Sequence, residues 1–285
     1  MKLIISDLDG TFLNSKHEVI AENVEALKAA QNEGIEIAIA TGRNYGNVLA
    51  LCQRAGLRPH VISNNGAFVY DKNGNQIKAV GLDKDQVREA LDWLKYRNYF
   101  YTLCTDHSVY MPDNAHSLLT SDYENAINHV RKMTPEKLKE GIDIFLTLDS
   151  AVFINDFNEI LEQDLIFGNI SAITLDHDKL LHGREYFSHY AGMAMTIAGK
   201  DIFEMIHPSV SKGNALAHLA AHLDISLDDA MAIGDNFNDI SMLKKVGISV
   251  AVANAEEEVK KICKYVSLSN DDNGVAHIIQ KIMGK

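Results

Sequence analysis

Short apolar runs that end in an acidic or glycine-containing loop, and are followed by a helical pattern, occur near both ends of the chain. Leu3–Ser6 and Ile35–Ala40 have this form in the N-terminal part, and Ala230–Ile233 and Ile248–Val252 have it in the C-terminal part. A short continuous apolar run is typical of a strand that is buried on both faces. Strands that alternate with helices through short connections predict a parallel sheet with right-handed crossovers. The two terminal parts are therefore predicted to form one doubly wound, Rossmann-like parallel α/β domain.

The middle of the chain follows a less regular pattern. Val87, Leu91 and Leu94 recur at helical spacing. The strand-like runs after this helix are Tyr99–Cys104, Ile142–Leu148 and Ile202–Ile206. Polar segments are denser here than in the terminal parts. We interpret residues 84–207 as a second α/β domain that is inserted into the first, so that residues 1–83 and 208–285 form the core domain.

Charge and cysteine content restrict the possible partners and location. A formal net charge of −12 disfavours a nucleic-acid binder or an anionic-membrane binder, because both need a basic surface. The three cysteines are far apart and form neither a disulfide framework nor a paired metal motif, which indicates a reducing compartment. The N-terminal apolar run reaches Asp7 before the core of a signal peptide can form, and no apolar run is long enough for a membrane span. We therefore expect a cytoplasmic protein.

Three separated segments follow predicted strands and carry the polar side chains that chemistry needs. They are Asp7–Thr11, Thr41–Arg43 and Gly234–Asp239. In open α/β sheets, ligands bind beyond the carboxyl ends of the strands, so these segments are expected to converge at one edge. An edge so rich in carboxylates requires a cation.

Magnesium fits this set of side chains. Mg²⁺ prefers oxygen ligands and is typically bound by one or two carboxylates together with water and a substrate phosphate. Asp7 and Asp235 are natural ligands, and a carbonyl near Asp9 would add another. A phosphoryl group also needs a hydroxyl or amide to bind its oxygens, which Thr41 can supply, and a nucleophile, for which a carboxylate is suitable.

These segments resemble the motifs of the haloacid dehalogenase-like superfamily of phosphohydrolases, and specifically its Cof-type branch. The resemblance covers essentially the whole chain in order: Asp7-Leu8-Asp9-Gly10-Thr11, Ala40-Thr41-Gly42-Arg43, Lys212 within Val210–Gly213, and Gly234-Asp235-Asn236-Phe237-Asn238-Asp239. The turn Asn64–Ala67 and the late segment Asp271–Ala276 are also similar to the Cof-type pattern. In one departure, Ala253 stands where a glycine commonly precedes the Asn-Ala pair. The branch carries a cap domain between its second and third motifs, which is where the insertion is predicted.

The resemblance implies a Mg²⁺-dependent phosphatase that acts on a small phosphorylated metabolite, such as a sugar phosphate, through an aspartyl-phosphate. It implies a catalytic role for Asp7 as nucleophile, for Asp9 as general acid and base, and for Lys212. Thr41, the Gly42 amide, Lys212 and Asn238 would bind or position the phosphoryl group. Asp7, Asp9, Asp235 and Asp239 would form or support the metal site. The cap would determine which substrate is accepted.

Two other functions remain compatible with the same motifs. A phosphomutase would use the same chemistry at Asp7 but return the phosphoryl group to its substrate. A binding or regulatory protein on this scaffold would carry out no chemistry, although Asp7, Asp9, Lys212 and Asp235 are all present. Release of inorganic phosphate distinguishes the phosphatase from both alternatives.

Overall fold

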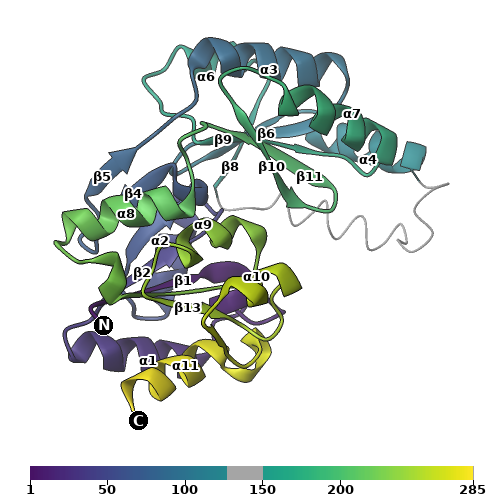
Figure 1. Cartoon of the computed structure of the whole chain (residues 1–285). Coiled ribbons are helices and arrows are strands. Elements are labelled where there is room, and N and C mark those ends of the chain that lie inside the picture. Colours follow the sequence, from purple (N-terminus) through teal and green to yellow (C-terminus); the bar gives the residue numbers. More distant parts are fainter. Residues whose placement is uncertain (127–149, 285) are drawn as a thin grey trace. The chain divides into compact units, whose positions relative to one another are not determined.

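A computed structural model describes residues 1–126 and 150–284 of the chain. The chain divides into two compact units, and Figure 1 labels many of their helices and strands. The core unit comprises Met1–Ala79 and Ser209–Lys285, and the inserted unit comprises Val80–Pro208. The inserted unit includes residues 84–207, which we expect to form the inserted domain. The strand predicted over Ile142–Leu148 lies outside the described residues.

The core unit is built on an eight-stranded sheet with the order β14-β13-β12-β1-β2-β3-β4-β5. Its strands are β1 (Leu3–Asp7), β2 (Glu36–Ala40), β3 (His60–Ser63), β4 (Phe68–Tyr70), β5 (Gln76–Ala79), β12 (Ala230–Gly234), β13 (Ile248–Ala251) and β14 (Tyr265–Val266). The strands from β14 to β3 are parallel, which confirms the predicted α/β core. The antiparallel strands β4 and β5 were not expected. The tight turn after β3 reverses the chain into β4 without a crossover helix, and a second turn over residues 71–75 reverses it again into β5.

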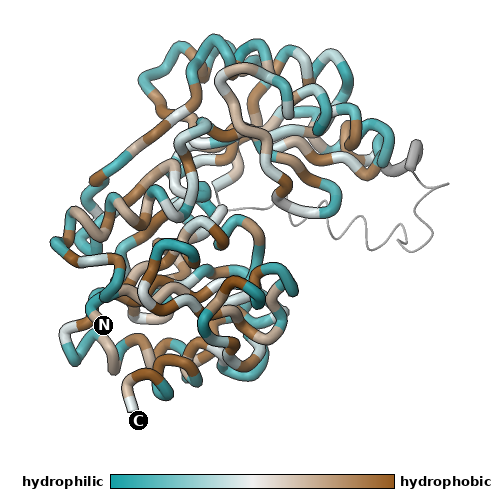
Figure 2. The backbone as a smooth tube through the Cα atoms, viewed as in Figure 1, coloured by the Kyte–Doolittle hydropathy of each residue, from teal (hydrophilic) through white to brown (hydrophobic). Residues whose placement is uncertain are grey.

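Helices lie on both faces of the core sheet. Figure 1 shows α1 and α11 along one face and α8 and α9 along the other. The helices are α1 (Ala21–Asn32), α2 (Tyr45–Arg54), α8 (Lys212–His222), α9 (Ile240–Leu243), α10 (Glu257–Ile262) and α11 (Gly274–Met283), and the short turns are η1 (Leu8–Phe12), η2 (Asn64–Gly66), η3 (Leu227–Asp229), η4 (Phe237–Asp239) and η5 (Asn270–Asp272). Figure 2 shows hydrophobic and hydrophilic residues interspersed along α11, as expected for a helix with one buried face. None of the helices in the described part of the chain has an apolar stretch of the length that a bilayer span requires.

The carboxyl ends of four central strands meet at one edge of the core sheet. Asp7 at the end of β1 lies beside Ala40 at the end of β2, and Ser6 lies beside Ile233 of β12. Strand β3 continues the same parallel arrangement next to β2. The loops that follow these strands therefore gather at one place, and they contain the candidate site.

The inserted unit is built on a six-stranded sheet with the order β10-β11-β9-β6-β7-β8. Its strands are β6 (Phe100–Cys104), β7 (Val109–Pro112), β8 (Ala151–Ile154), β9 (Asn169–Ile173), β10 (Ala194–Gly199) and β11 (Ile202–Ile206), and its helices are α3 (Lys84–Tyr96), α4 (Ala115–Ala126), α6 (Asn158–Leu161) and α7 (His177–Ser188). Helices α3 and α7 begin after Asp83 and Asp176, whose carboxylates accept hydrogen bonds from N–H groups of the first turn. Apolar side chains of α3, α6 and α7 form one core cluster with the sheet, which includes Tyr99, Phe187 and Phe203. The single tryptophan, Trp93 on α3, packs against this cluster.

A buried carboxylate links α4 to the segment around the start of α7 in the inserted unit. Asp122 on α4 is 5% exposed. Its Oδ1 accepts a hydrogen bond from Lys179 Nζ at 2.6 Å, and its Oδ2 accepts from Thr174 Oγ1 at 2.6 Å and from the backbone N–H of Leu175. Every donor comes from the segment that joins β9 to α7 or from α7 itself. The carboxylate is therefore a polar link between α4 and this part of the unit.

We expect Asp122→Ala to lower the free energy of unfolding of the inserted unit by about 1–3 kcal/mol, because it leaves the buried Thr174 hydroxyl and the Leu175 N–H without their acceptor. Lys179 contributes less to this cost, because its side chain is 19% exposed and its Nζ also donates to the carbonyl of Asn98. Trp93 lies in this unit, so urea unfolding followed by tryptophan fluorescence measures the change. Glu257→Ala removes an exposed ion pair with Lys260 in the core unit and serves as the control, for which no shift of the curve is expected. Coincident curves for Asp122→Ala and the wild type would show that the link is dispensable.

Candidate functional site

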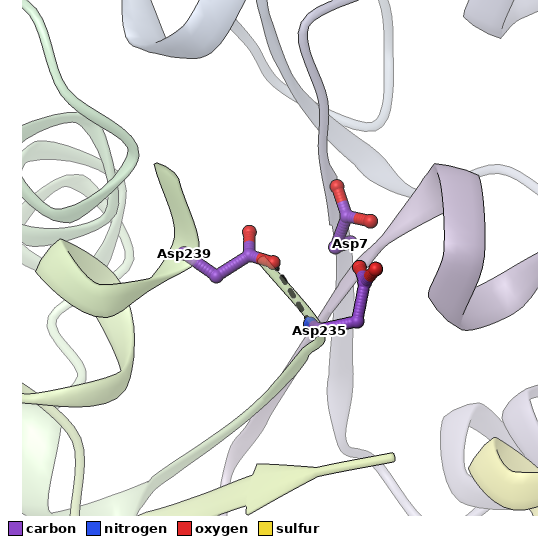
Figure 3. Close-up of side chains that lie close together, drawn as sticks. All are labelled: Asp7, Asp235 and Asp239. Atoms are coloured by element: carbon purple, nitrogen blue, oxygen red, sulfur yellow. Dashed lines mark hydrogen bonds between the residues drawn. The ribbon is translucent and has the colours of Figure 1, made fainter. Parts of the chain in front are cut away.

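Three carboxylates meet at the carboxyl edge of the core sheet (Figure 3). Asp7 is the last residue of β1, and Asp235 and Asp239 belong to the loop after β12. One side-chain oxygen from each lies within 4.8 Å of those of the other two. Asp7 and Asp239 are buried, and Asp235 is partly buried. The structure thus brings together the side chains of Asp7, Asp235 and Asp239, three of the four residues predicted for the metal site; the fourth, Asp9, was expected to contribute through a nearby carbonyl.

Asp239 organises the loop that carries Asp235. Its Oδ2 accepts hydrogen bonds from the backbone N–H groups of Asp235 at 3.0 Å and Asn236 at 3.1 Å, and Figure 3 shows the first of these as a dashed line. A Cβ atom at Gly234 would lie 2.6 Å from the carboxyl carbon of Asp239, so the close approach requires glycine there. Asp239 therefore supports the site by shaping the loop.

Lys212 lies between two of the carboxylates. It is the first residue of α8 and is 1% exposed. Its Nζ donates hydrogen bonds to Oδ1 of Asp7 at 2.6 Å and to Oδ1 of Asp239 at 2.7 Å. Burial by itself would lower the pKa of Lys212, but the charges and hydrogen bonds of these two carboxylates raise it above its usual value. Both carboxylates therefore favour the charged form of Lys212, and its ammonium joins β1 to the loop after β12.

One ammonium does not compensate three carboxylates. Burial raises the pKa of Asp7 well above its usual value, although Lys212 opposes this shift and Asp239 and Asp235 add to it. Burial and the charge of Asp239 raise the pKa of Asp235 to about 6. The cluster offers only oxygen ligands and has an excess of negative charge, which is the donor chemistry that a hard divalent cation requires.

Asp9 is turned toward two cationic or potentially cationic side chains. Arg43 donates from Nε to Oδ2 at 2.8 Å and from Nη2 to Oδ1, and His17 Nδ1 lies 3.1 Å from Oδ1. Burial would raise the pKa of Asp9, but the hydrogen bonds and charges of Arg43 and His17 lower it below its usual value. Asp9 is therefore an ionised carboxylate in this arrangement. Its carboxylate is not part of the cluster that Asp7, Asp235 and Asp239 form.

The residues between Asp9 and the first helix position Asp235. Thr11 Oγ1 donates a hydrogen bond to Oδ1 of Asp235 at 2.9 Å. Gly10 has a φ of +80°, and a Cβ atom there would lie 2.5 Å from Oδ2 of Asp235. The loop after β1 therefore approaches Asp235 so closely that only glycine fits at position 10.

Apart from Lys212, the residues predicted to bind phosphate follow β2 and β12. Thr41 is 1% exposed, and its Oγ1 accepts a hydrogen bond from the N–H of Arg43 at 3.1 Å. Gly42 comes next in the chain. Asn238 is exposed, and its Nδ2 donates to Oδ1 of Asn65 at 3.1 Å. The roles of these residues remain predictions.

Three contacts of the site were not predicted from the sequence. Arg43 stands in a recognised motif, but its partner Asp9 is 34 residues away, and no local pattern joins the two. His17 contacts Asp9, and the backbone of His17 has a φ of 60°, which no pattern in the sequence indicates. Asn65 lies in a turn that was recognised without a role for its side chain. Each of these contacts becomes visible only when the distance between the two side chains in the folded protein is known.

Comparison with known proteins identifies close similarities over the whole chain. Residues 4–279 match the family model of haloacid dehalogenase-like hydrolases. The chain is 37% identical to phosphatase YwpJ of Bacillus subtilis, with 99% of this chain and 100% of that protein covered. It is 30% identical to the 5-amino-6-(5-phospho-D-ribitylamino)uracil phosphatase YwtE of the same organism, with 99% and 98% covered. The solved structure of a haloacid dehalogenase-like hydrolase from B. subtilis is similar with a TM-score of 0.84 and 36% identity, over 98% of this chain and 99% of that one.

We expect Lys212→Met to destabilise the metal-free protein by about 3–5 kcal/mol near neutral pH, because it leaves buried carboxylates uncompensated. Without the ammonium, the pKa of Asp235, which is about 6 in the wild type, would rise further, because the charge of Lys212 lowers it. A carboxyl whose pKa is higher in the folded than in the unfolded protein lowers the free energy of unfolding as the pH rises from its unfolded pKa to its folded pKa. The difference from the wild type should therefore grow as the pH rises from about 5 to about 7.5.

Urea unfolding in EDTA at these two pH values measures the effect. Lys244→Met, which removes an exposed lysine near the same loop, is the matched control and should change stability little at either pH. A difference between Lys212→Met and the wild type that stays constant with pH would contradict the compensating role of the ammonium.

Proposed function

Because the chain belongs to the family of haloacid dehalogenase-like hydrolases and is a phosphatase like its relatives, we propose that it hydrolyses small phosphorylated metabolites with Mg²⁺ at the carboxylate cluster. We further propose that the reaction passes through an aspartyl-phosphate on Asp7. The observation that carries the proposal is the convergence of Asp7, Asp235 and Asp239 around the ammonium of Lys212. A carboxylate nucleophile, a hard-metal donor set and a buried cation are together at one sheet edge.

The chemistry of the metal and of the phosphoryl-binding residues is electrostatic. When bound, Mg²⁺ would neutralise negative charge on the phosphoryl group and polarise its oxygens. Asp7 and Asp235 would bind it, with Asp239 shaping the loop that carries Asp235. Thr41, the Gly42 amide, Lys212 and Asn238 would hold the phosphoryl oxygens and keep phosphorus in line with Asp7.

In the first half of the proposed reaction, a carboxylate oxygen of Asp7 attacks phosphorus. The bond between phosphorus and the ester oxygen breaks, and the leaving oxygen takes a proton from Asp9. The contacts of Asp9 with Arg43 and His17 favour its ionised form. For this step Asp9 must therefore exchange one of these contacts for a proton and the leaving oxygen.

In the second half, water attacks the phosphorus of the aspartyl-phosphate. The ionised Asp9 takes a proton from this water, and the bond between phosphorus and the Asp7 oxygen breaks. Inorganic phosphate leaves, and Asp7 is regenerated. The contacts that lower the pKa of Asp9 suit this step, because they hold the carboxylate in the form that acts as a base.

We propose that the inserted domain, residues 84–207, is a cap that selects the substrate. Every residue with a proposed chemical role lies in 1–83 or 208–285, so the inserted segment is left for recognition of the leaving group. The relative YwtE is named for a phosphorylated ribityl compound, which makes polyol and sugar phosphates the first substrates to assay. The three free cysteines fit the proposed cytoplasmic location.

We expect EDTA to abolish hydrolysis of p-nitrophenyl phosphate, and Mg²⁺ to restore it. Binding of Mg²⁺ should also raise the melting temperature of the protein, and the increase should be larger at pH 7.5 than at pH 5. The reason is that the pKa of Asp235 is raised to about 6, so that a proton competes with the metal at the lower pH. Thermal unfolding with and without Mg²⁺, at matched ionic strength, measures this. Full turnover in the chelator would refute the metal requirement.

The two N-terminal carboxylates should behave differently when their charge is removed. Asp7→Asn should eliminate turnover, because an amide is a poor nucleophile and a poor Mg²⁺ ligand. Asp9→Asn should lower kcat about 10²–10⁴-fold, because it removes general acid–base help. The loss should be smaller for p-nitrophenyl phosphate, whose leaving group needs no proton, than for a sugar phosphate.

Release of inorganic phosphate is the measurement, because a phosphomutase would give an isomer without phosphate and a binding protein would give neither. Asp224→Asn, an exposed aspartate with a left-handed backbone, is the control and should retain full activity. Near-normal phosphate release by Asp7→Asn would remove Asp7 from the role of nucleophile.

A further inference from the structure

The turn after β3 has an unusual backbone. Asn64, Asn65 and Gly66 have successive φ angles of 47°, 55° and 110°. Non-glycine residues rarely adopt the left-handed region, and asparagine tolerates it better than most. Two consecutive asparagines in this region, followed by a glycine, require strong support from the surrounding structure.

The support comes from the segments that are proposed to bind phosphate. The N–H of Asn64 donates to the carbonyl of Arg43, and the N–H of Asn65 donates to the carbonyl of Thr41, both at 2.9 Å. On the other side, a Cβ atom at Gly66 would lie 2.4 Å from the carbonyl oxygen of Ser211. The turn is therefore fixed between the loop after β2 and the residue that precedes Lys212.

The side chain of Asn65 lies next to the loop after β2 and the loop after β12. A Cβ atom built at Gly42 would be 3.4 Å from Nδ2 and 3.5 Å from Oδ1 of Asn65, so the carboxamide packs directly against Gly42. Its Oδ1 accepts the hydrogen bond from Nδ2 of Asn238 at 3.1 Å, across 173 residues of sequence. One carboxamide thus contacts both loops that carry proposed phosphoryl ligands.

We propose that Asn65 is a positioning residue of the phosphoryl-binding site, which fixes Gly42 and Asn238 relative to each other. This inference rests on the proposed phosphatase function, because only then do these two residues bind a phosphoryl group. Asn65 acts on the part that all phosphate esters share. Its removal should therefore affect every substrate by a similar factor, whatever the leaving group.

Asn65→Gly tests the proposal, because glycine keeps the left-handed backbone and removes only the carboxamide. We expect kcat/KM to fall about 10- to 100-fold, by the same factor for p-nitrophenyl phosphate and for a sugar phosphate. The inhibition constant of inorganic phosphate should rise in parallel. Asn98→Gly makes the same change at an exposed position of the inserted unit with a φ of 56°, and it should leave all these values unaltered.

A double-mutant cycle with Asn238→Ala separates positioning from a general structural effect. If the two side chains act as one unit, the double variant Asn65→Gly, Asn238→Ala should be as active as the less active of the two single variants. Losses that multiply would overturn the proposal. So would an Asn65→Gly variant that is less stable but fully active below its melting temperature.

Wild-type turnover in the same assay distinguishes this inference from the proposed function. Absence of wild-type phosphate release would refute the proposed function, and the role of Asn65 with it. Normal wild-type release together with an unaltered Asn65→Gly variant would refute the role of Asn65 alone.

Discussion

The buried ammonium of Lys212 is the interaction on which the site depends. It joins Asp7 at the end of β1 to Asp239 in the loop after β12, and its backbone begins α8. Three distant segments are thus joined by one charge that is shielded from water. A buried charge with excellent partners is costly to disturb, because loss of any partner leaves the others uncompensated. The remaining negative charge of the cluster is what a divalent cation at this place would neutralise.

Two aspartates separated by a single residue have opposite environments. Asp7 lies among other carboxylates in a buried place, which raises its pKa, whereas the contacts of Asp9 with Arg43 and His17 overcome the effect of burial and lower its pKa. Groups of the same chemical type acquire different roles when their surroundings shift their pKa values apart. Because Asp7 ends a strand and Asp9 lies in the following loop, their side chains reach different neighbours.

Much of the fold and of the site was predictable, because the informative patterns are local. Apolar runs that end in polar loops predicted the central strands, and the carboxyl ends of parallel strands predicted where their loops meet. The antiparallel strands β4 and β5 were missed, because they are short and follow a tight turn. The contact of Arg43 with Asp9 and that of Asn65 with Asn238 were missed for another reason: each joins side chains that are far apart in the sequence.

The class of fold and the identity of the chemical groups follow from residue type and spacing along the chain, since these indicate which strands are buried and which carboxylates follow them. How those groups are paired depends on the folded arrangement. The pairing of Lys212 with Asp7 and Asp239, the separation of Asp9 from that cluster, and the packing of Asn65 on Gly42 all depend on the register of neighbouring strands and on close backbone approaches at glycines. These are distances between segments remote in the chain, and an interaction energy between charges or dipoles is determined by distance and burial.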